Sequence, residues 1–190
     1  MLPEFRTARL ALRQIAVADT AAMHAVFGDP EAMRHWDSPP SADVERTAAM
    51  VAYLAGVEPR FQGAWVATLD GESAPAAMVN YHSVVASHRR LAVGYILARR
   101  LWGRGLMAEA MTALLDHCVD TLDAHRVEAL IEPENRPSQR LAERLGFRCE
   151  SGPLRDRFIV GGEFRSVRMW ALFAPEWRAR RGAAAPSSEA

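Results

Sequence analysis

The sequence predicts one domain of the α+β class, in which helices cover a mixed sheet. The 190 residues, of which 49% are hydrophobic, are enough for a single core, and no linker-like segment divides them. The period of the hydrophobic residues changes several times between two, typical of strands, and about 3.6, typical of helices. The resulting strands and helices do not alternate strictly, which favours a mostly antiparallel mixed sheet over a doubly wound parallel one.

The first third of the chain predicts a strand, a helix, a loop and a second helix. Leu10 and Leu12 share one face of the strand. Asp19 is a residue type that caps helices, and apolar side chains recur four residues apart from there up to Phe27. Pro39 and Pro40 indicate a loop between the two helices. The predicted bounds are residues 7–13 for the strand, 19–27 and 43–57 for the helices, and 35–40 for the loop.

The middle of the chain predicts three strands. Asp70-Gly71 is a turn dipeptide between two apolar stretches, so these stretches pair as a hairpin. The third strand is apolar throughout, which places it in the centre of the sheet. The predicted strands are residues 64–69, 76–81 and 91–97.

The last part of the chain predicts two helices, three strands and a tail. Leu106, Ala110, Leu114 and Cys118 recur every four residues, and this segment is the strongest helix of the chain. A later, shorter helix ends at Gly146. We expect helices at residues 106–119 and 138–145, strands at 126–131, 147–150 and 165–173, and a disordered tail at 178–190.

The composition argues against several classes of protein. Basic and acidic residues number 23 each, and a net charge of zero argues against a general nucleic-acid binder. Every basic residue is arginine, which removes Schiff-base lysine from the possible mechanisms. The two cysteines, Cys118 and Cys149, make neither a disulfide framework nor a zinc site, so we expect no metal. No apolar run approaches the roughly 20 residues of a membrane helix, and no secretory signal is visible, so we expect a cytoplasmic protein that does not bind membranes.

A glycine-containing turn before the strongest helix is the most informative segment. The strand at 91–97 runs into Arg100-Leu-Trp-Gly-Arg-Gly105, which leads directly into that helix. Gly103 and Gly105 permit a positive φ and a close backbone approach. The first amides of a helix lack intrahelical partners and attract anions. Local positive charge comes from Arg99, Arg100 and Arg104. The turn therefore predicts a pyrophosphate site, with an ordinary loop and solvated arginines as the alternative.

A second informative segment follows the strand at 126–131. Asn135 begins a short helix, with Pro137 in its first turn, and Ser138 lies one turn further on. Taken alone, Asn135 is explained as an N-cap and Ser138 as a residue that satisfies a backbone group.

The two segments in this order resemble the GNAT acetyltransferase superfamily, and within it the RimJ/RimL type, which acetylates protein N-termini and small amines. The resemblance extends from residue 7 to residue 170. The motifs that carry it are Gly94-Tyr95, Arg100-x-x-Gly103-x-Gly105, Met107-x-Glu109-Ala110, His125-Arg126-Val127, Asn135-x-x-Ser138 and Leu145-Gly146-Phe147.

The resemblance implies a GNAT-like domain at residues 1–177, with a mixed sheet that splays open between a central parallel pair of strands. Acetyl-CoA would lie in that split, with its pantetheine arm against the backbone of Ile96 and Leu97. Its pyrophosphate would meet the turn formed by Arg100, Leu101, Trp102, Gly103, Arg104, Gly105 and Leu106. A dinucleotide-binding fold is disfavoured because the third glycine of its motif is missing.

The resemblance also implies roles for Asn135 and Ser138. The counterpart of Asn135 holds the cofactor arm, and Ser138 is our candidate for protonating the departing thiolate. Many relatives use a tyrosine for this step, but Ala142 stands at that position.

The general base is not identified from the sequence. The positions where relatives carry acids hold Phe158, Ser166 and Ala92 here. Water chains that end at His82, Asp37 or Glu132 remain options. Trp36 and Trp65 could line a substrate pocket, although such aromatic residues usually belong to the core.

The sequence thus predicts an N-acetyltransferase that acts in a ternary complex on a peptide or protein N-terminus or on a small-molecule amine. Its acceptor is left open, and homodimers are common among the proteins it resembles. The alternative is a non-catalytic acyl-CoA-binding or interaction module, which would release no thiol in the presence of amines.

Overall fold

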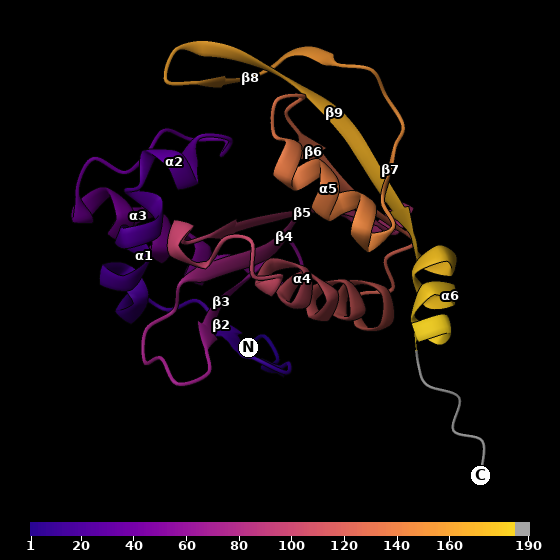
Figure 1. Cartoon of the computed structure of the whole chain (residues 1–190), viewed down its shortest axis with the longest axis horizontal. Helices are drawn as coiled ribbons and strands as arrows, with labels where there is room; N and C mark the ends of the chain where they lie inside the picture. Colours follow the sequence, from indigo (N-terminus) through magenta and orange to yellow (C-terminus); the bar gives the residue numbers. More distant parts are fainter. Residues whose placement is uncertain (185–190) are drawn as a thin grey trace.

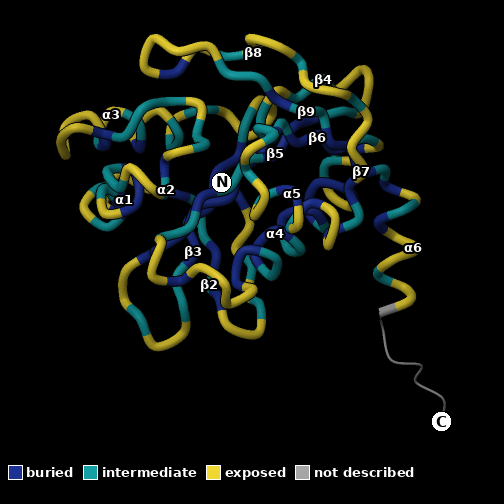
Figure 2. Tube along the Cα trace, turned by 45° about the horizontal axis from the view of Figure 1, so that its top comes forward, coloured by how far each residue is buried: buried dark blue, intermediate teal, exposed yellow. Residues whose placement is uncertain are grey.

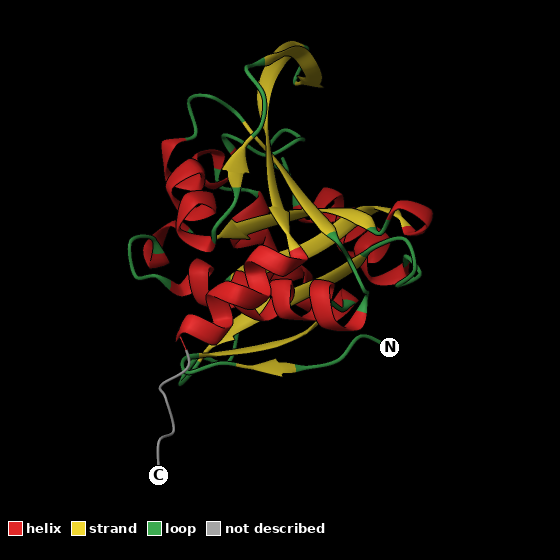
Figure 3. Ribbon diagram, turned by 90° about the vertical axis from the view of Figure 1, so that its right-hand side faces the viewer, coloured by secondary structure: helices red, strands yellow, loops and turns green. Residues whose placement is uncertain are grey.

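The computed structural model describes residues 1–184, which form one mixed sheet with helices on both faces (Figures 1 and 3). The strands lie in the order β1-β2-β3-β4-β5-β6-β9-β7, and β8 pairs with β9 outside this path. The strands are β1 (Phe5–Arg6), β2 (Leu10–Gln14), β3 (Gly63–Leu69), β4 (Ala77–Val85), β5 (Arg90–Leu97), β6 (Arg126–Ile131), β7 (Arg148–Cys149), β8 (Leu154–Val160) and β9 (Glu163–Phe173). The helices are α1 (Thr20–Phe27), α2 (Pro30–Met33), α3 (Val44–Gly56), α4 (Leu106–Asp116), α5 (Arg136–Leu145) and α6 (Ala174–Ala184).

The predicted α+β fold is confirmed. All paired strands of the sheet run antiparallel except β5 and β6, which are parallel to each other. Two antiparallel strands can be joined by a tight turn, whereas two parallel strands need a crossover. Here α4 is that crossover, and it lies across the sheet below β4 and β5 (Figure 1).

The central strands are apolar at nearly every position because both faces of the sheet are buried (Figure 2). Trp65 and Val79 pack with α4 in the larger core cluster. Val66 and Met78, one residue along, point to the opposite face and pack with α1 and α3 in a second cluster. Side chains of a strand alternate between faces, so a double-sided core requires a continuous apolar run.

The helix boundaries follow from local capping. The carboxylate of Asp43 accepts the backbone N–H of Arg46 at 2.7 Å and starts α3. Asp19 was predicted to cap α1, but its side chain instead accepts the N–H of Ala16 and pairs with Arg13. Within residues 1–184, no helix is both long and apolar enough to cross a membrane.

Three short or polar elements were not predicted: β1, α2 and β8. The first two contain only two and four residues, which is too short for a hydrophobic period. Strand β8 carries exposed charged side chains at Arg155, Asp156 and Arg157. It is a strand because it pairs with β9 in a hairpin that extends above the rest of the sheet (Figure 1).

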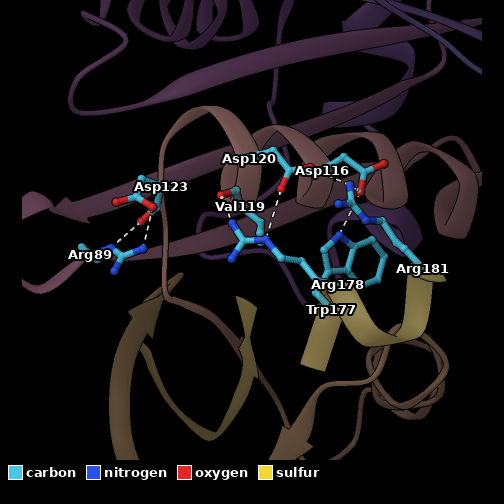
Figure 4. Close-up of polar contacts among 8 residues, drawn as sticks. All are labelled: Arg89, Asp116, Val119, Asp120, Asp123, Trp177, Arg178 and Arg181. Carbon is cyan, nitrogen blue, oxygen red and sulfur yellow. Dashed lines mark hydrogen bonds and ion pairs between the residues drawn. The ribbon is translucent and has the colours of Figure 1, made fainter. Parts of the chain in front are cut away.

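The predicted disorder from residue 178 is wrong for residues 178–184, which belong to α6, while 185–190 lie outside the described residues. The indole N–H of Trp177 donates to Asp116 Oδ1 at 2.9 Å (Figure 4). Arg181 pairs with Asp116 at 2.7 Å and with Asp120 at 2.6 Å, and Arg178 donates to the Val119 carbonyl (Figure 4). These contacts join α6 to the last residue of α4 and to the π-helical turn His117–Thr121 that follows it, and their acidic partners are distant in sequence.

Candidate functional site

The parallel strands β5 and β6 separate after a short paired segment. Residues 90–92 of β5 pair with residues 126–128 of β6, and the pairing between these two strands ends at Ala92. A cavity of about 680 Å³ opens where the strands diverge. Its walls include Asn80 and His82 of β4, Gly94 and Tyr95 of β5, Ile131 and Glu132 at the end of β6, and Asn135 and Ser138 of α5.

One edge of β5 is free to pair with an extended ligand. The Ala98 N–H donates to the Ala76 carbonyl, next to the end of β4. Along an antiparallel ladder, every second residue directs its backbone N–H and C=O to the neighbouring strand, and the residues between direct theirs away. The backbone of Ile96 therefore faces β4, and its side chain is buried in the core. The expectation that the Ile96 backbone meets the cofactor is corrected, because Tyr95 and Leu97 present their backbones to the split. The Leu97 carbonyl accepts the indole N–H of Trp102 at 2.8 Å, which leaves its amide as the available group.

The predicted anion-binding turn lies between β5 and α4. Gly103 and Gly105 have φ values of +74° and +75°, which other residues rarely adopt. A Cβ on Gly103 would meet nothing within 4 Å, so the space beside the backbone is open. Within residues 1–184, the amides of Gly103, Arg104 and Gly105 donate to no backbone carbonyl. Leu101 and Leu106 are buried, so only their backbones could contribute to a ligand site.

The arginines around this turn differ in their availability. Arg100 makes a two-pronged pair with Glu72 at 2.8 and 2.6 Å, and Arg99 pairs with Asp29 at 3.3 Å. Arg104 has no ion pair within the part of the chain that the structure describes. Most of the attraction for an anion at the turn therefore comes from the free amides and Arg104.

Asn135 and Ser138 lie together at the start of α5, as predicted. The Asn135 side-chain oxygen accepts the Ser138 N–H at 3.2 Å, so Asn135 is the N-cap of the helix. The Ser138 hydroxyl makes no hydrogen bond within residues 1–184, which leaves it available to a ligand in the cavity. The Tyr95 hydroxyl donates to the Ser138 carbonyl at 3.5 Å, and burial raises the pKa of Tyr95 to about 12.

All three sequence candidates for a base, His82, Asp37 and Glu132, line the cavity. Burial lowers the pKa of His82, although the nearby Asp37 opposes this. The Glu132 carboxylate is already engaged, by His35 at 2.6 Å and by Arg165 at 3.1 Å. His35 is not among the residues predicted from the sequence, because a histidine in a loop gives no periodic signal.

Asn80 is a cavity residue that only the structure assigns. Asn80 is 7% exposed, and its side-chain oxygen has no hydrogen-bond partner in residues 1–184. A Cβ on Gly94 would lie 2.6 Å from that oxygen, which explains the glycine in this strand. Trp36 lines the cavity, whereas Trp65 is fully buried in the core and donates to the Pro3 carbonyl.

Comparisons with known proteins agree with this geometry. The model of the acetyltransferase (GNAT) domain matches residues 9–148. An uncharacterized N-acetyltransferase of Bacillus licheniformis is 29% identical over 172 residues, which cover 90% of this chain and 96% of that protein. The [ribosomal protein uS5]-alanine N-acetyltransferase of Escherichia coli is 35% identical over 101 residues, which cover 53% of this chain and 52% of that protein.

Solved structures share the fold. A GNAT-family acetyltransferase from Bacillus anthracis superposes with a TM-score of 0.80 at 24% identity, covering 92% of this chain and 100% of that one. The spermidine N-acetyltransferase of Vibrio cholerae, in complex with CoA and spermine, superposes with a TM-score of 0.77 at 18% identity, covering 89% and 98%. The domain match, the splayed β5–β6 pair and the glycine turn before α4 together show that this chain belongs to the GNAT acetyltransferase family and is an acyltransferase.

Proposed function

We propose that this enzyme transfers an acetyl group from acetyl-CoA to a primary amine by direct attack within a ternary complex. The observation that carries this proposal is the split between β5 and β6. It combines a free strand edge, a cavity of about 680 Å³ and a turn with unpartnered amides. A linear cofactor with an amide-containing arm and a diphosphate matches these three features in order.

The residues fit acetyl-CoA as follows. The pantetheine arm lies along β5, where Tyr95 and Leu97 offer backbone groups as a neighbouring strand would. The pyrophosphate lies on the turn, where the amides of residues 103–105 lack backbone partners. The positive φ of Gly103 and the open space beside it let a phosphate approach the backbone closely. Bound there, acetyl-CoA supplies an activated acyl group.

Asn135 and Ser138 complete the reaction site in this proposal. Both line the same cavity as the edge of β5, and Asn135 holds the first turn of α5 in place through its capping bond. That leaves the Asn135 side-chain NH2 group available to hold the cofactor arm. The free Ser138 hydroxyl donates its proton to the CoA thiolate as the carbon–sulfur bond breaks.

The acceptor is a primary amine, and an α-amine at a peptide or protein N-terminus suits the site better than a lysine side chain. Deprotonating an α-amine at pH 7 costs roughly 1–1.4 kcal/mol, against roughly 4.6 kcal/mol for lysine. The relatives named for uS5 alanine and for spermidine show that related chains act on both protein and small-molecule amines.

Thiol release tests the proposal. The purified chain is mixed with acetyl-CoA and one amine at a time, and free CoA is measured with a thiol reagent. The amines are peptides that begin with alanine or serine, spermidine and Nα-acetyl-lysine methyl ester. We expect amine-dependent release with at least one of these amines, and more release with the α-amines of the peptides than with the lysine side chain. CoA binding by calorimetry without release for any amine supports the non-catalytic binding module instead.

A further inference from the structure

A histidine and a carboxylate form a hydrogen-bonded pair in the wall of the cavity. His35, in the loop after α2, and Glu132, at the end of β6, are 97 residues apart in the chain, and His35 Nδ1 lies 2.6 Å from Glu132 Oε2. The His35 side chain is 25% exposed and lines the cavity that also contains Asn135 and Ser138. The pair therefore faces the space in which the acceptor amine and the thioester would meet.

The pairing decides which imidazole nitrogen carries the proton. An ionised carboxylate only accepts hydrogen bonds, so the hydrogen lies on His35 Nδ1. In the neutral ring, Nε2 then has a free lone pair, and Nε2 makes no hydrogen bond within residues 1–184. A carboxylate that orients a histidine in this way is the arrangement by which hydrolytic triads prepare a base.

Glu132 is held in position by groups other than His35. Arg165 of β9 lies 3.1 Å from Glu132 Oε1, the oxygen that His35 does not use. The backbone carbonyl of Glu132 accepts the N–H of Asn135 at 3.0 Å and the side-chain N–H of Gln139 at 3.1 Å. The backbone of Glu132 is thus joined to the start of α5, where Asn135 and Ser138 lie, while Arg165 holds its carboxylate.

From this geometry we infer that His35 is the general base of the acetyl transfer and that Glu132 is its positioning residue. This inference rests on the proposed function. His35 Nε2 takes a proton from the acceptor ammonium, and the amine nitrogen then forms a bond to the acetyl carbon. The carbon–sulfur bond breaks as the Ser138 hydroxyl protonates the thiolate. The attacking nitrogen gives up its second proton, which restores the Ser138 hydroxyl and leaves a neutral amide, and His35 returns its own proton to water.

The other charged groups around the pair distinguish it from His82. Asp37 and His82 line the same cavity, but His82 Nδ1 pairs with the Ser83 hydroxyl and not with a carboxylate. A hydroxyl can donate or accept, so it does not determine the tautomer of His82. The Arg34 side chain, next to His35, pairs with Glu31, whereas Arg165 pairs with Glu132.

The first test measures kcat as a function of pH with the amine that the thiol assay identifies. His35→Asn keeps an N–H donor for Glu132 but removes the base. We expect kcat to fall by about 10²–10⁴-fold near neutral pH, with CoA affinity unchanged. The acid-side decline of kcat in the unaltered enzyme is expected to be absent in this variant. His88→Asn, in an exposed turn outside the cavity, is the matched control and is expected to match the unaltered enzyme.

A decline of kcat at low pH that persists in His35→Asn and disappears in His82→Asn overturns the inference and assigns the base to His82. An unchanged kcat in His35→Asn also overturns it. Failure of the proposed function is distinguishable, because it appears in the unaltered enzyme as the absence of amine-dependent thiol release.

The second test needs no turnover. Two-bond proton–nitrogen NMR correlations on the cofactor-free protein identify the tautomer of each histidine. We expect the Nδ1–H form for His35, and a shift towards a mixture of tautomers in Glu132→Gln, with a lower kcat and unchanged CoA affinity. Observation of the Nε2–H form for His35 in the unaltered protein contradicts the inference.

Discussion

Gly94 lies directly against the side chain of Asn80 on the neighbouring strand, so that a Cβ on Gly94 would be 2.6 Å from Asn80 Oδ1. The two residues are register partners in β4 and β5 at the point where β5 leaves β6. The absence of a side chain at position 94 leaves room for the Asn80 carboxamide in the wall of the cavity.

Gly94→Ala should therefore destabilise the protein. The added methyl group forces Asn80 or the strand to move, which typically costs about 1–3 kcal/mol. Urea unfolding measures this change. Gly56→Ala is the matched control, because a Cβ there meets nothing within 4 Å and alanine favours the helix by up to about 1 kcal/mol. Equal midpoints for Gly94→Ala and the unaltered protein would contradict the steric argument.

Gly103→Glu should abolish CoA binding. The carboxylate places a negative charge and added bulk beside the amides that would hold the pyrophosphate, and φ at this position is +74°. Gly162→Glu, at a φ of +88° in the β8–β9 turn with the same open space, introduces the same charge and backbone strain far from the turn. Calorimetry should show CoA binding in the control alone, and normal binding in Gly103→Glu rules out the proposed pyrophosphate site.

Ser138→Ala should lower kcat far more than it weakens CoA binding. Loss of a general acid typically costs about 10²–10⁴-fold in rate, whereas the capping bond to Asn135 uses the backbone N–H and survives the change. Steady-state kinetics and calorimetry separate the two effects. Ser87→Ala, in an exposed turn, serves as the control. If kcat is unchanged in Ser138→Ala, Ser138 takes no part in proton transfer.

Trp177→Ala should destabilise the fold by about 3–5 kcal/mol, the usual range for a buried aromatic residue. Trp177 is 3% exposed and donates to Asp116, so the change removes both packing and the link from α6 to α4. Thermal unfolding is the measurement, with the 65% exposed Phe164→Ala as the control. Similar losses in the two variants would mean that α6 does not support the core.

Stability should fall in acid partly because of Glu109. Burial alone would raise the pKa of Glu109, but hydrogen bonds from Thr7 and Arg9 outweigh it and hold the pKa below its ordinary value of 4.5. A carboxyl group whose pKa is lower in the folded state stabilises the fold above its ordinary pKa of 4.5. This stabilisation is lost as the pH falls from 4.5 through the pKa of the folded state.

Glu109→Gln should accordingly be less stable near pH 7, by about 1–3 kcal/mol, and should lose less stability between pH 5 and pH 3 than the unaltered protein. Denaturant unfolding at several pH values tests both effects. Glu31→Gln, which removes an exposed pair with Arg34, is expected to change stability by under about 1 kcal/mol. Parallel pH profiles for Glu109→Gln and the unaltered protein would exclude this role.

The order of the main strands and helices was predictable because each depends on residues near it in the chain. Hydrophobic alternation indicated β2 to β4, and a continuous apolar run indicated β5. The four-residue recurrence indicated α4, and glycine and asparagine marked the ends of α4 and α5. The anion-binding turn and the Asn135–Ser138 pair were found for the same reason, since the atoms that form each lie within a few residues of one another.

The remaining features depend on which distant residues the fold brings together. Whether the backbone of Ile96 faces β4 or the split follows from the ladder register, and a shift of one residue would reverse it. The His35–Glu132 pair joins positions 97 residues apart, and Trp177 meets Asp116 over 61 residues. No local pattern encodes such contacts, because they form only when sheet pairing and helix packing place the separate segments side by side.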